Sequence, residues 1–306
     1  MIRKACTPSH ELQCLRVLHR RMNFSPGQRQ YYVSLEKGFE GEQTLNQSLL
    51  QLEHDTIIMN DLLIEHHHSF YQIDTLVLTY DQAYLFEVKH YEGEYYLHKN
   101  RLYLMNGKEM KDPLLQLQRS EAFLRQTFQT LPLTLPIQAL VAYTHPFFIL
   151  YHASSELPVL LPNQLQRFIQ KWNQEPSYPL TDQHHHAAEQ LLTLHWDMSP
   201  YTRLPDYDYP SLTKGMSCPF CSGWMKERKN TLTCSSCGHK ETRRSGIQRS
   251  IEEFRLLFPQ DKLTTSIIYD WCGLRCSRKN VSRVLLSHYQ RVGKGKGSYY
   301  VSPPHR

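Results

Sequence analysis

Two carboxylates and a lysine lie on neighbouring apolar segments in the first third of the chain. Asp74 lies near the start of one such segment, and Glu87 and Lys89 lie two residues apart in the next. Because side chains alternate along a strand, Glu87 and Lys89 must share one face, while Phe86 and Val88 point to the other. If the two strands form a hairpin and Asp74 pairs with Glu87 or Lys89, all three side chains share that face.

This set of groups favours a metal site. Two carboxylates and an ammonium on apolar strands are costly to bury without compensation, which a hard divalent cation supplies. Mg²⁺ or Mn²⁺ takes oxygen ligands and is commonly held by one or two carboxylates together with a substrate phosphate. The lysine can then orient or activate a water molecule. A Glu-x-Lys pair alone is weak support, because a salt bridge at a strand edge gives the same pattern.

Glu42 adds a third carboxylate from an expected helix. The helix begins near residues 38–41, and Glu42 stands three and seven residues before Leu45 and Leu49, so it shares their inward face. We interpret Glu42 either as a charge favoured at the helix start or as part of the metal site.

The elements that must position these residues follow in order along the chain. Apolar runs at 73–79, 84–89 and 95–98 predict an antiparallel meander. Asp112 and Pro113 predict a helix start, because a capping carboxylate precedes a proline. Strands are expected at 137–142 and 159–161, followed by a helix from Asn163 through Trp172. Together they predict one mixed α/β domain.

Several of these residues form an ordered set with a family resemblance. The set consists of Gly41-Glu42, Gln72-Ile73-Asp74, Glu87-Val88-Lys89 with Gly93, and Asp112-Pro113 with Gln116. Over residues 37–141 it resembles the nuclease-related domain, NERD, a branch of the PD-(D/E)XK nuclease superfamily.

The resemblance implies a restriction-endonuclease-like core, which is a mixed sheet flanked by helices. It also implies Asp74 and Glu87 as metal ligands, Lys89 as the catalytic lysine, and Glu42 and Gln116 as supporting polar residues. The sequence departs from the family pattern at Gln72, where an acidic residue is frequent, and at Asp112, where Asn is common.

Four cysteines form two close pairs, Cys218-x2-Cys221 and Cys234-x2-Cys237. Each pair can chelate one side of a tetrahedral Zn²⁺ ion, and the twelve-residue spacer suits a hairpin. The pattern is similar to zinc ribbons and predicts a structural ion, because four thiolates leave no open position. Unliganded reduced cysteines are the alternative.

The last sixty residues predict three helices and a hairpin, as in a winged helix-turn-helix. Ser277 is expected to cap the third helix, and glycines separate the cations of the hairpin tip. Donors suited to phosphates and base edges lie on this helix and tip: Arg278, Lys279, Asn280, Arg283, Lys294 and Lys296. The alternative is a winged helix used for protein contacts.

The net charge of +6 is unevenly divided. Residues 211–306 hold 18 Lys and Arg against 6 Asp and Glu, a net of +12, which leaves 17 against 23, a net of −6, in residues 1–210. This division predicts that one end meets a polyanion, with DNA first, RNA possible, and anionic lipid the second class of candidate.

The predicted domains are a helical arm at 1–37, the nuclease-like domain at 38–175, a helix and Pro/Tyr-rich linker at 176–213, the zinc module at 214–245 and the winged helix at 246–306. We expect no membrane span or signal peptide, and therefore a cytoplasmic protein. The histidine triplets at 66–68 and 184–186 are expected on solvated surfaces.

The sequence thus predicts a metal-dependent nuclease that cleaves DNA held by its basic C-terminal region. A non-catalytic DNA-binding or regulatory protein that keeps the nuclease fold as a scaffold is the alternative.

Overall fold

The chain divides into two compact units, each built from separate stretches of sequence. In the computed structural model, the described residues are 1–303 except 67–68, 100, 222, 229–230 and 275. Residues 1–10 and 33–202 form unit 1, and residues 11–32 and 203–306 form unit 2. The five predicted domains remain a prediction. In the described part of the chain, no helix has the length and apolar character that crossing a membrane requires.

Unit 1 is a mixed α/β fold around a six-stranded sheet with strand order β1-β2-β3-β4-β7-β9. The β2–β3 and β3–β4 pairs are antiparallel, and the β1–β2, β4–β7 and β7–β9 pairs are parallel. The strands of this sheet are β1 (Ile2–Lys4), β2 (Ile57–His66), β3 (Ser69–Leu78), β4 (Ala83–Lys89), β7 (Ile137–Tyr143) and β9 (Val159–Leu160).

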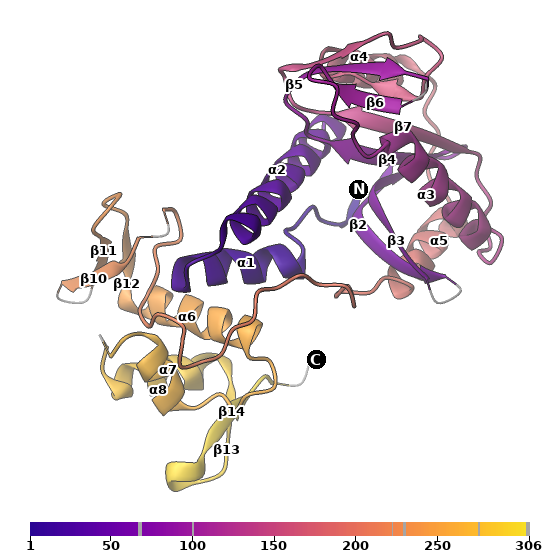
Figure 1. The fold of residues 1–306 in the computed structure, drawn as a ribbon. Helices are drawn as coiled ribbons and strands as arrows, with labels where there is room; N and C mark the ends of the chain where they lie inside the picture. The colour runs from indigo at the N-terminus through magenta and orange to yellow at the C-terminus, as the bar shows by residue number, and fades with distance from the viewer. Residues whose placement is uncertain (67–68, 100, 222, 229–230, 275, 304–306) are drawn as a thin grey trace. The chain divides into compact units, whose positions relative to one another are not determined.

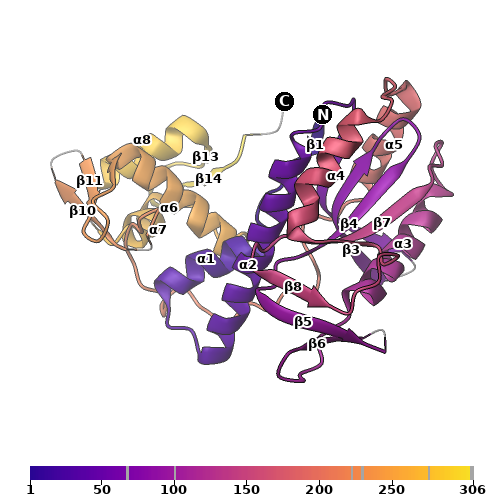
Figure 2. The ribbon, with the colours of Figure 1, turned by 90° about the horizontal axis from the view of Figure 1, so that it is seen from above.

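Helices cover both faces of this sheet, which confirms the predicted mixed sheet flanked by helices (Figures 1 and 2). One face packs against residues of α2 (Pro26–Leu49) and α4 (Pro162–Gln174), through Leu45 and Trp172. The other packs against α3 (Pro113–Phe128) and α5 (Asp182–Thr193), through Leu124 and Leu191. Phe86 and Val88 contribute to the α2 and α4 side, as the alternation along β4 predicts.

The alternation of side chains breaks at one place in β2 and β3. Ile57 and Met59 share a core cluster with Leu62 and Ile64, so the inward positions change parity at Asp61. Asp61 has a φ of 51°, in the left-handed region that few non-glycine residues adopt. On β3 the same change falls between Ile73 and Leu76, next to Asp74. The break therefore lies at two acidic residues.

A second sheet of three strands, in the order β6-β5-β8, packs on the α3 side of the core through Tyr95, Leu102 and Phe148. Its strands are β5 (Gly93–His98), β6 (Arg101–Leu104) and β8 (Phe148–Tyr151). The predicted three-stranded meander is therefore wrong at its third strand. β5 pairs with β6 and β8 instead of continuing the sheet after β4, because residues 90–92 carry the chain away from it.

Unit 2 contains a small three-stranded sheet, a group of helices and a hairpin. Arg21 of α1 (His10–Arg21) contacts two later segments of this unit. Its Nη2 lies 2.5 Å from Glu253 Oε2, and its guanidinium lies 3.8 Å from the Trp271 ring centroid. The other elements are β10 (Met225–Arg228), β11 (Thr231–Cys234), β12 (Lys240–Thr242), α6 (Arg243–Leu257), α7 (Thr265–Trp271), α8 (Arg278–His288), β13 (Gln290–Val292), a 3₁₀ turn (Gly295–Gly297) and β14 (Tyr299–Val301).

The three helices and the β13–β14 hairpin follow in the order predicted for residues 246–306. Ser277 caps α8 as predicted, because its hydroxyl accepts a hydrogen bond from the Asn280 N–H. Helix α6 begins at Arg243 and so starts upstream of the predicted domain boundary. The winged-helix assignment itself stays a prediction.

Two further expectations are wrong. The second helix begins at Pro26 instead of near residues 38–41, because Ser25 and Gln28 cap its start: the Gln28 N–H donates to Ser25 Oγ, and the Ser25 N–H donates to Gln28 Oε1. His184 is buried and not solvated, because its ring contacts the Thr181 hydroxyl and the Tyr80 carbonyl oxygen. His67 and His68 lie outside the described residues.

Candidate functional site

The end of β4 brings Glu87 and Lys89 onto one face, as predicted. Lys89 Nζ lies 2.5 Å from Glu87 Oε1 and donates a hydrogen bond to Gln116 Oε1 at 3.3 Å. Glu87 is only 1% exposed, so its charge depends on these neighbours in place of water. The Lys89 ammonium, beside the Glu87 and Asp74 carboxylates, has its pKa raised despite the opposing effect of burial.

Gln116 reaches this site from the first turn of α3. Asp112 caps that helix by accepting a hydrogen bond from the Leu114 N–H at 2.9 Å, and Pro113 is the first helical residue. Both features of this helix start are confirmed. Asp112 is therefore the N-cap residue of α3.

Asp74 lies beside Glu87 across the β3–β4 pair. Thr75 pairs with Phe86, so Asp74 and Glu87 are the next residues on the two strands. The Val88 backbone N–H donates to Asp74 Oδ2 at 2.7 Å and fixes the carboxylate. Burial, followed by the Glu87 charge, raises the pKa of Asp74.

Glu42 joins these residues from α2. Sixteen residues of α2 precede it, so the alternative of a charge at the helix start is wrong. Burial raises the pKa of Glu42, and the carboxylates of Asp74 and Asp61 raise it further. Gly41 allows the close approach of α2, because a Cβ at this position would come 2.7 Å from the Cβ of His90.

Asp61, which the sequence analysis did not select, is the fourth carboxylate. Its Oδ1 accepts a hydrogen bond from Gln72 Nε2 at 2.8 Å, and its Oδ2 lies 3.8 Å from the ammonium of Lys4 on β1. Its charge contributes to the raised pKa of both Glu42 and Asp74. An available signal was a charged residue, next to Asn60, between the apolar residues of 57–59 and 62–64.

These residues form what we call the acidic centre: Glu42, Asp61, Asp74 and Glu87, with Lys4 and Lys89. Four carboxylates and two ammoniums give a formal charge of −4 + 2 = −2. Burial raises the pKa of each carboxylate, which means that the folded protein disfavours their charged forms. A bound divalent cation would offset this unfavourable free energy. The donor set, all oxygen, fits Mg²⁺ or Mn²⁺.

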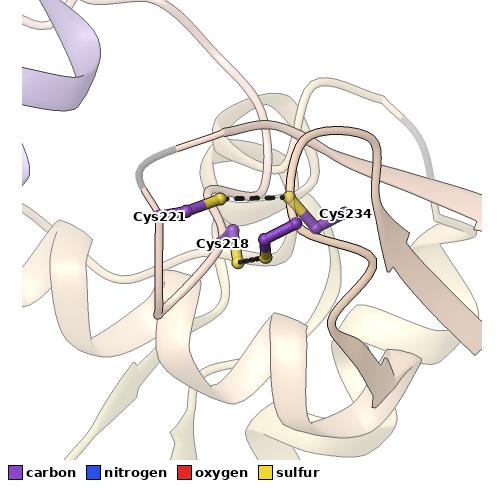
Figure 3. A group of neighbouring side chains, drawn as sticks. Cys218, Cys221 and Cys234 are labelled. Carbon is purple, nitrogen blue, oxygen red and sulfur yellow. Dashed lines mark hydrogen bonds between the residues drawn. The ribbon is translucent and has the colours of Figure 1, made fainter.

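The four predicted cysteines come together in unit 2, between the loop before β10 and the turn after β11 (Figure 3). Their sulfur atoms all lie within 4.8 Å of one another. The Cys218–Cys237 and Cys221–Cys234 sulfur pairs are 3.7 and 3.4 Å apart. A tetrahedral ion with bonds of about 2.3 Å places sulfurs about 3.8 Å apart, so the cluster has the size of a zinc site.

The backbone supports the charge on these sulfurs. The Phe220 N–H donates to Cys218 Sγ, and the Ser236 N–H donates to Cys234 Sγ, both at 3.4 Å. Backbone N–H groups of Cys237 and Ser236 lower the pKa of Cys234 to about 6. Gly238 has a φ of 75°, a left-handed conformation that glycine adopts without strain, so it allows a tight turn after the second cysteine pair.

The predicted nucleic-acid donors lie on α8 and near the hairpin tip. Arg278, Lys279, Arg283 and Lys294 are exposed, and Asn280 is half-buried. Arg278 donates to Ser266 Oγ at 2.9 Å. The side chain of Lys296 lies outside the described part of the structure.

A family model matches the segment of the chain that contains the four carboxylates of the acidic centre. Residues 37–144 match the family model described as the nuclease-related domain, over about a third of the chain. No curated protein and no solved structure matches the chain. The matched segment contains all four carboxylates of the acidic centre together with Lys89 and Gln116. The chain therefore carries a nuclease-related domain at residues 37–144.

Proposed function

We propose that this chain is a metal-dependent nuclease that hydrolyses phosphodiester bonds of DNA at the acidic centre. The observation that carries the proposal is the contact of Lys89 with Glu87 and Gln116 beside Asp74, within a nuclease-related domain. Perturbed carboxylates beside a lysine are frequent at catalytic sites.

Asp74 and Glu87 would hold Mg²⁺ or Mn²⁺, with Glu42 in support. When bound, the cation stabilises the negative charge that develops on the phosphate during displacement. Lys89 orients the attacking water, because its ammonium is fixed by Glu87 and Gln116 at the edge of the site. Asp61 supplies a carboxylate beside Gln72, so the acidic character of this place is kept although residue 72 is an amide.

The test is cleavage of labelled linear, circular and branched DNA with Mg²⁺, Mn²⁺ or chelator. Lys89→Ala should abolish cleavage while Mn²⁺ binding, measured by calorimetry, persists; Asp74→Ala and Glu87→Ala should lose both. Lys37→Ala removes an exposed ammonium that contacts Glu92 in the same domain and serves as the control. Cleavage by all three site variants at the parent rate would exclude the acidic centre as the active site.

The second candidate function is a non-catalytic nucleic-acid-binding protein that keeps the fold as a scaffold. The net charge of +12 in residues 211–306 favours binding at this end whether or not cleavage occurs. DNA binding without cleavage on any substrate, in either cation, would support this candidate against the first.

We further propose that the four-cysteine cluster holds one structural Zn²⁺ ion and that the basic C-terminal region supplies most of the DNA affinity. RNA is the alternative nucleic acid. For duplex DNA, removing one lysine or arginine that neutralises a phosphate reduces the slope of log affinity against log salt by about 0.9. Neutral replacements of the exposed cations Arg278, Lys279, Arg283, Lys294 and Lys296 should therefore weaken binding and flatten the slope.

Replacement is a cleaner test than deletion of residues 246–306. Such a deletion would remove Glu253, the ion-pair partner of the buried Arg21, and would leave α1 uncovered. An unchanged slope in the substituted protein would instead favour a protein partner for this region.

A further inference from the structure

A cavity of about 460 Å³ lies in unit 2 between the start of α6 and one face of α8. Its lining combines charged, polar and apolar groups: Thr242, Arg243, Arg244, Ile247, Asn280, Arg283, Val284 and Ser287. None of these residues belongs to the acidic centre or to the four-cysteine cluster.

The lining follows from the helical period. On α8, Asn280, Arg283, Val284 and Ser287 are spaced by three, one and three residues, which places them along one stripe of the helix. On α6, Arg243 and Ile247 are four residues apart and face the same side. The cavity is therefore a structural consequence of how two helices pack, and its lining residues are held by secondary structure.

The charge of the cavity has one sign. Three of the eight lining residues are arginines, and no lining residue is acidic. Arg243 makes an ion pair with Glu227, which lies outside the lining, while its Nε is buried and has no hydrogen-bond partner among the described residues. Arg244 and Arg283 are exposed, and neither makes a hydrogen bond or ion pair within the described part of the chain.

The start of α6 adds to this positive potential. Thr242 caps the helix by accepting a hydrogen bond from the Ser245 N–H at 3.1 Å, so it belongs both to the helix end and to the cavity wall. The helix has 15 residues, and the positive end of its dipole lies at this wall. An anion placed there meets guanidinium groups from two helices and the helix end together.

Size and apolar surface narrow the class of anion. A cavity of about 460 Å³ is within the range of sites for small organic ligands and is far larger than a single phosphate needs. Ile247 and Val284 add apolar surface to the lining beside the arginines. Guanidinium groups form paired hydrogen bonds with phosphate, and an apolar wall suits a base or sugar.

We propose that this cavity binds a nucleoside monophosphate group, either free or at the 5′ end of a nucleic acid strand. The phosphate contacts Arg244 and Arg283, and the nucleoside packs on Ile247 and Val284. The site goes beyond the proposed cleavage reaction, because it lies in unit 2 and needs no divalent cation.

The experiment measures binding by the full zinc-loaded chain without added Mg²⁺ or Mn²⁺, so that no cleavage occurs. Fluorescence anisotropy compares a single-stranded dodecamer carrying a 5′ phosphate with the same strand carrying a 5′ hydroxyl. Calorimetry with dAMP, deoxyadenosine and inorganic phosphate measures the free ligands. Charge-assisted hydrogen bonds predict about tenfold tighter binding of the phosphorylated strand, and dAMP should bind more tightly than either of its parts.

Two replacements and a matched control locate the effect. Arg244→Gln and Arg283→Gln should reduce the preference for the 5′ phosphate to less than about twofold. Lys279→Gln removes one charge from the same helix outside the cavity and should weaken both strands equally, leaving their ratio unchanged. All three side chains are exposed, so the fold should persist, which thermal unfolding checks.

Binding of free dAMP would assign the cavity to nucleotides in general, and a 5′ phosphate preference without dAMP binding would assign it to strand ends. Equal affinity for both strands together with no dAMP binding would overturn the proposal. A preference that survives both arginine replacements would also overturn it, as would inorganic phosphate binding as tightly as dAMP. Because no cation is present, an inactive acidic centre does not affect these results.

Discussion

Glu42→Gln should stabilise the metal-free protein while it weakens cation binding. The side chain of Glu42 lies among the carboxylates of Asp61, Asp74 and Glu87, and burial with these charges raises its pKa from 4.5 to about 9. A carboxyl group whose pKa is raised on folding contributes most stability below its unfolded pKa and loses that contribution as the pH rises through its folded pKa. Stability of unit 1 should therefore fall between about pH 4.5 and pH 9.

The size of the effect follows from the same shift. Each pKa unit corresponds to about 1.36 kcal/mol, so at pH 8 the cost has an upper bound of about 5 kcal/mol. Glu42 is half-buried, and water reduces this cost to about 2 to 3 kcal/mol. Glutamine keeps the shape of the protonated carboxyl and removes the titration, so Glu42→Gln should gain about this amount at pH 8.

The assay is urea unfolding at pH 5 and pH 8, with unit 1 followed by hydrogen exchange of β3 and β4. The control is Glu40→Gln, which removes a carboxylate that is 69% exposed on the same helix. Added Mg²⁺ should stabilise the parent protein more than Glu42→Gln. If the metal-free Glu42→Gln protein is no more stable at pH 8 than Glu40→Gln, the proposed repulsion between Glu42 and the other carboxylates of the acidic centre is refuted.

Three further predictions concern packing, metal and the buried ion pair. Gly41→Ala should lower the free energy of unfolding by about 1 to 3 kcal/mol and weaken Mn²⁺ binding, because the new Cβ forces α2 away from the acidic centre. Gly38→Ala is the control on the same helix: its new Cβ meets no atom within 4 Å, so it should stabilise the helix by about 0.5 to 1 kcal/mol. Reduced, freshly purified protein should contain one zinc ion per chain by metal analysis. Cys234→Ser should lose the zinc ion and destabilise the β10–β12 sheet. A parent protein without zinc would contradict the proposed zinc site. Arg21→Met should destabilise unit 2 by about 3 to 5 kcal/mol, measured by denaturant unfolding, because it leaves the Glu253 carboxylate without its closest partner. A loss of stability below about 1 kcal/mol would show that the other neighbours of Glu253 are enough to stabilise its charge.

The parts of the site that local rules determine could be predicted from sequence. Alternation along one strand fixed the shared face of Glu87 and Lys89, and cap chemistry predicted the start of α3 at Asp112 and Pro113. The four cysteines were identifiable because a chelating pair needs only two intervening residues. Each of these features depends on residues that are close in sequence.

The remaining parts depend on contacts between distant segments. The alternation of inward and outward side chains breaks at Asp61 and next to Asp74, so counting residues along either strand does not predict which way these carboxylates point. The break becomes visible only when the two strands are paired. Lys4 reaches Asp61 because β1 pairs with β2 across more than fifty residues. The apolar run of β5 looks like a continuation of the meander, yet its partners are β6 and β8.

The discontinuity of unit 2 has a consequence for the order in which the protein can fold during synthesis. The face of α1 that carries Leu12, Leu15 and Leu18 is buried, and Arg21 pairs with Glu253 of α6. A ribosome adds about 5 to 20 residues per second, so about 10 to 50 seconds pass between the synthesis of α1 and that of α6. The sheet of unit 1 can be complete before α1 acquires its partners. A nascent chain halted after residue 202 should therefore expose an apolar helix, and chaperones that bind such surfaces should recognise it.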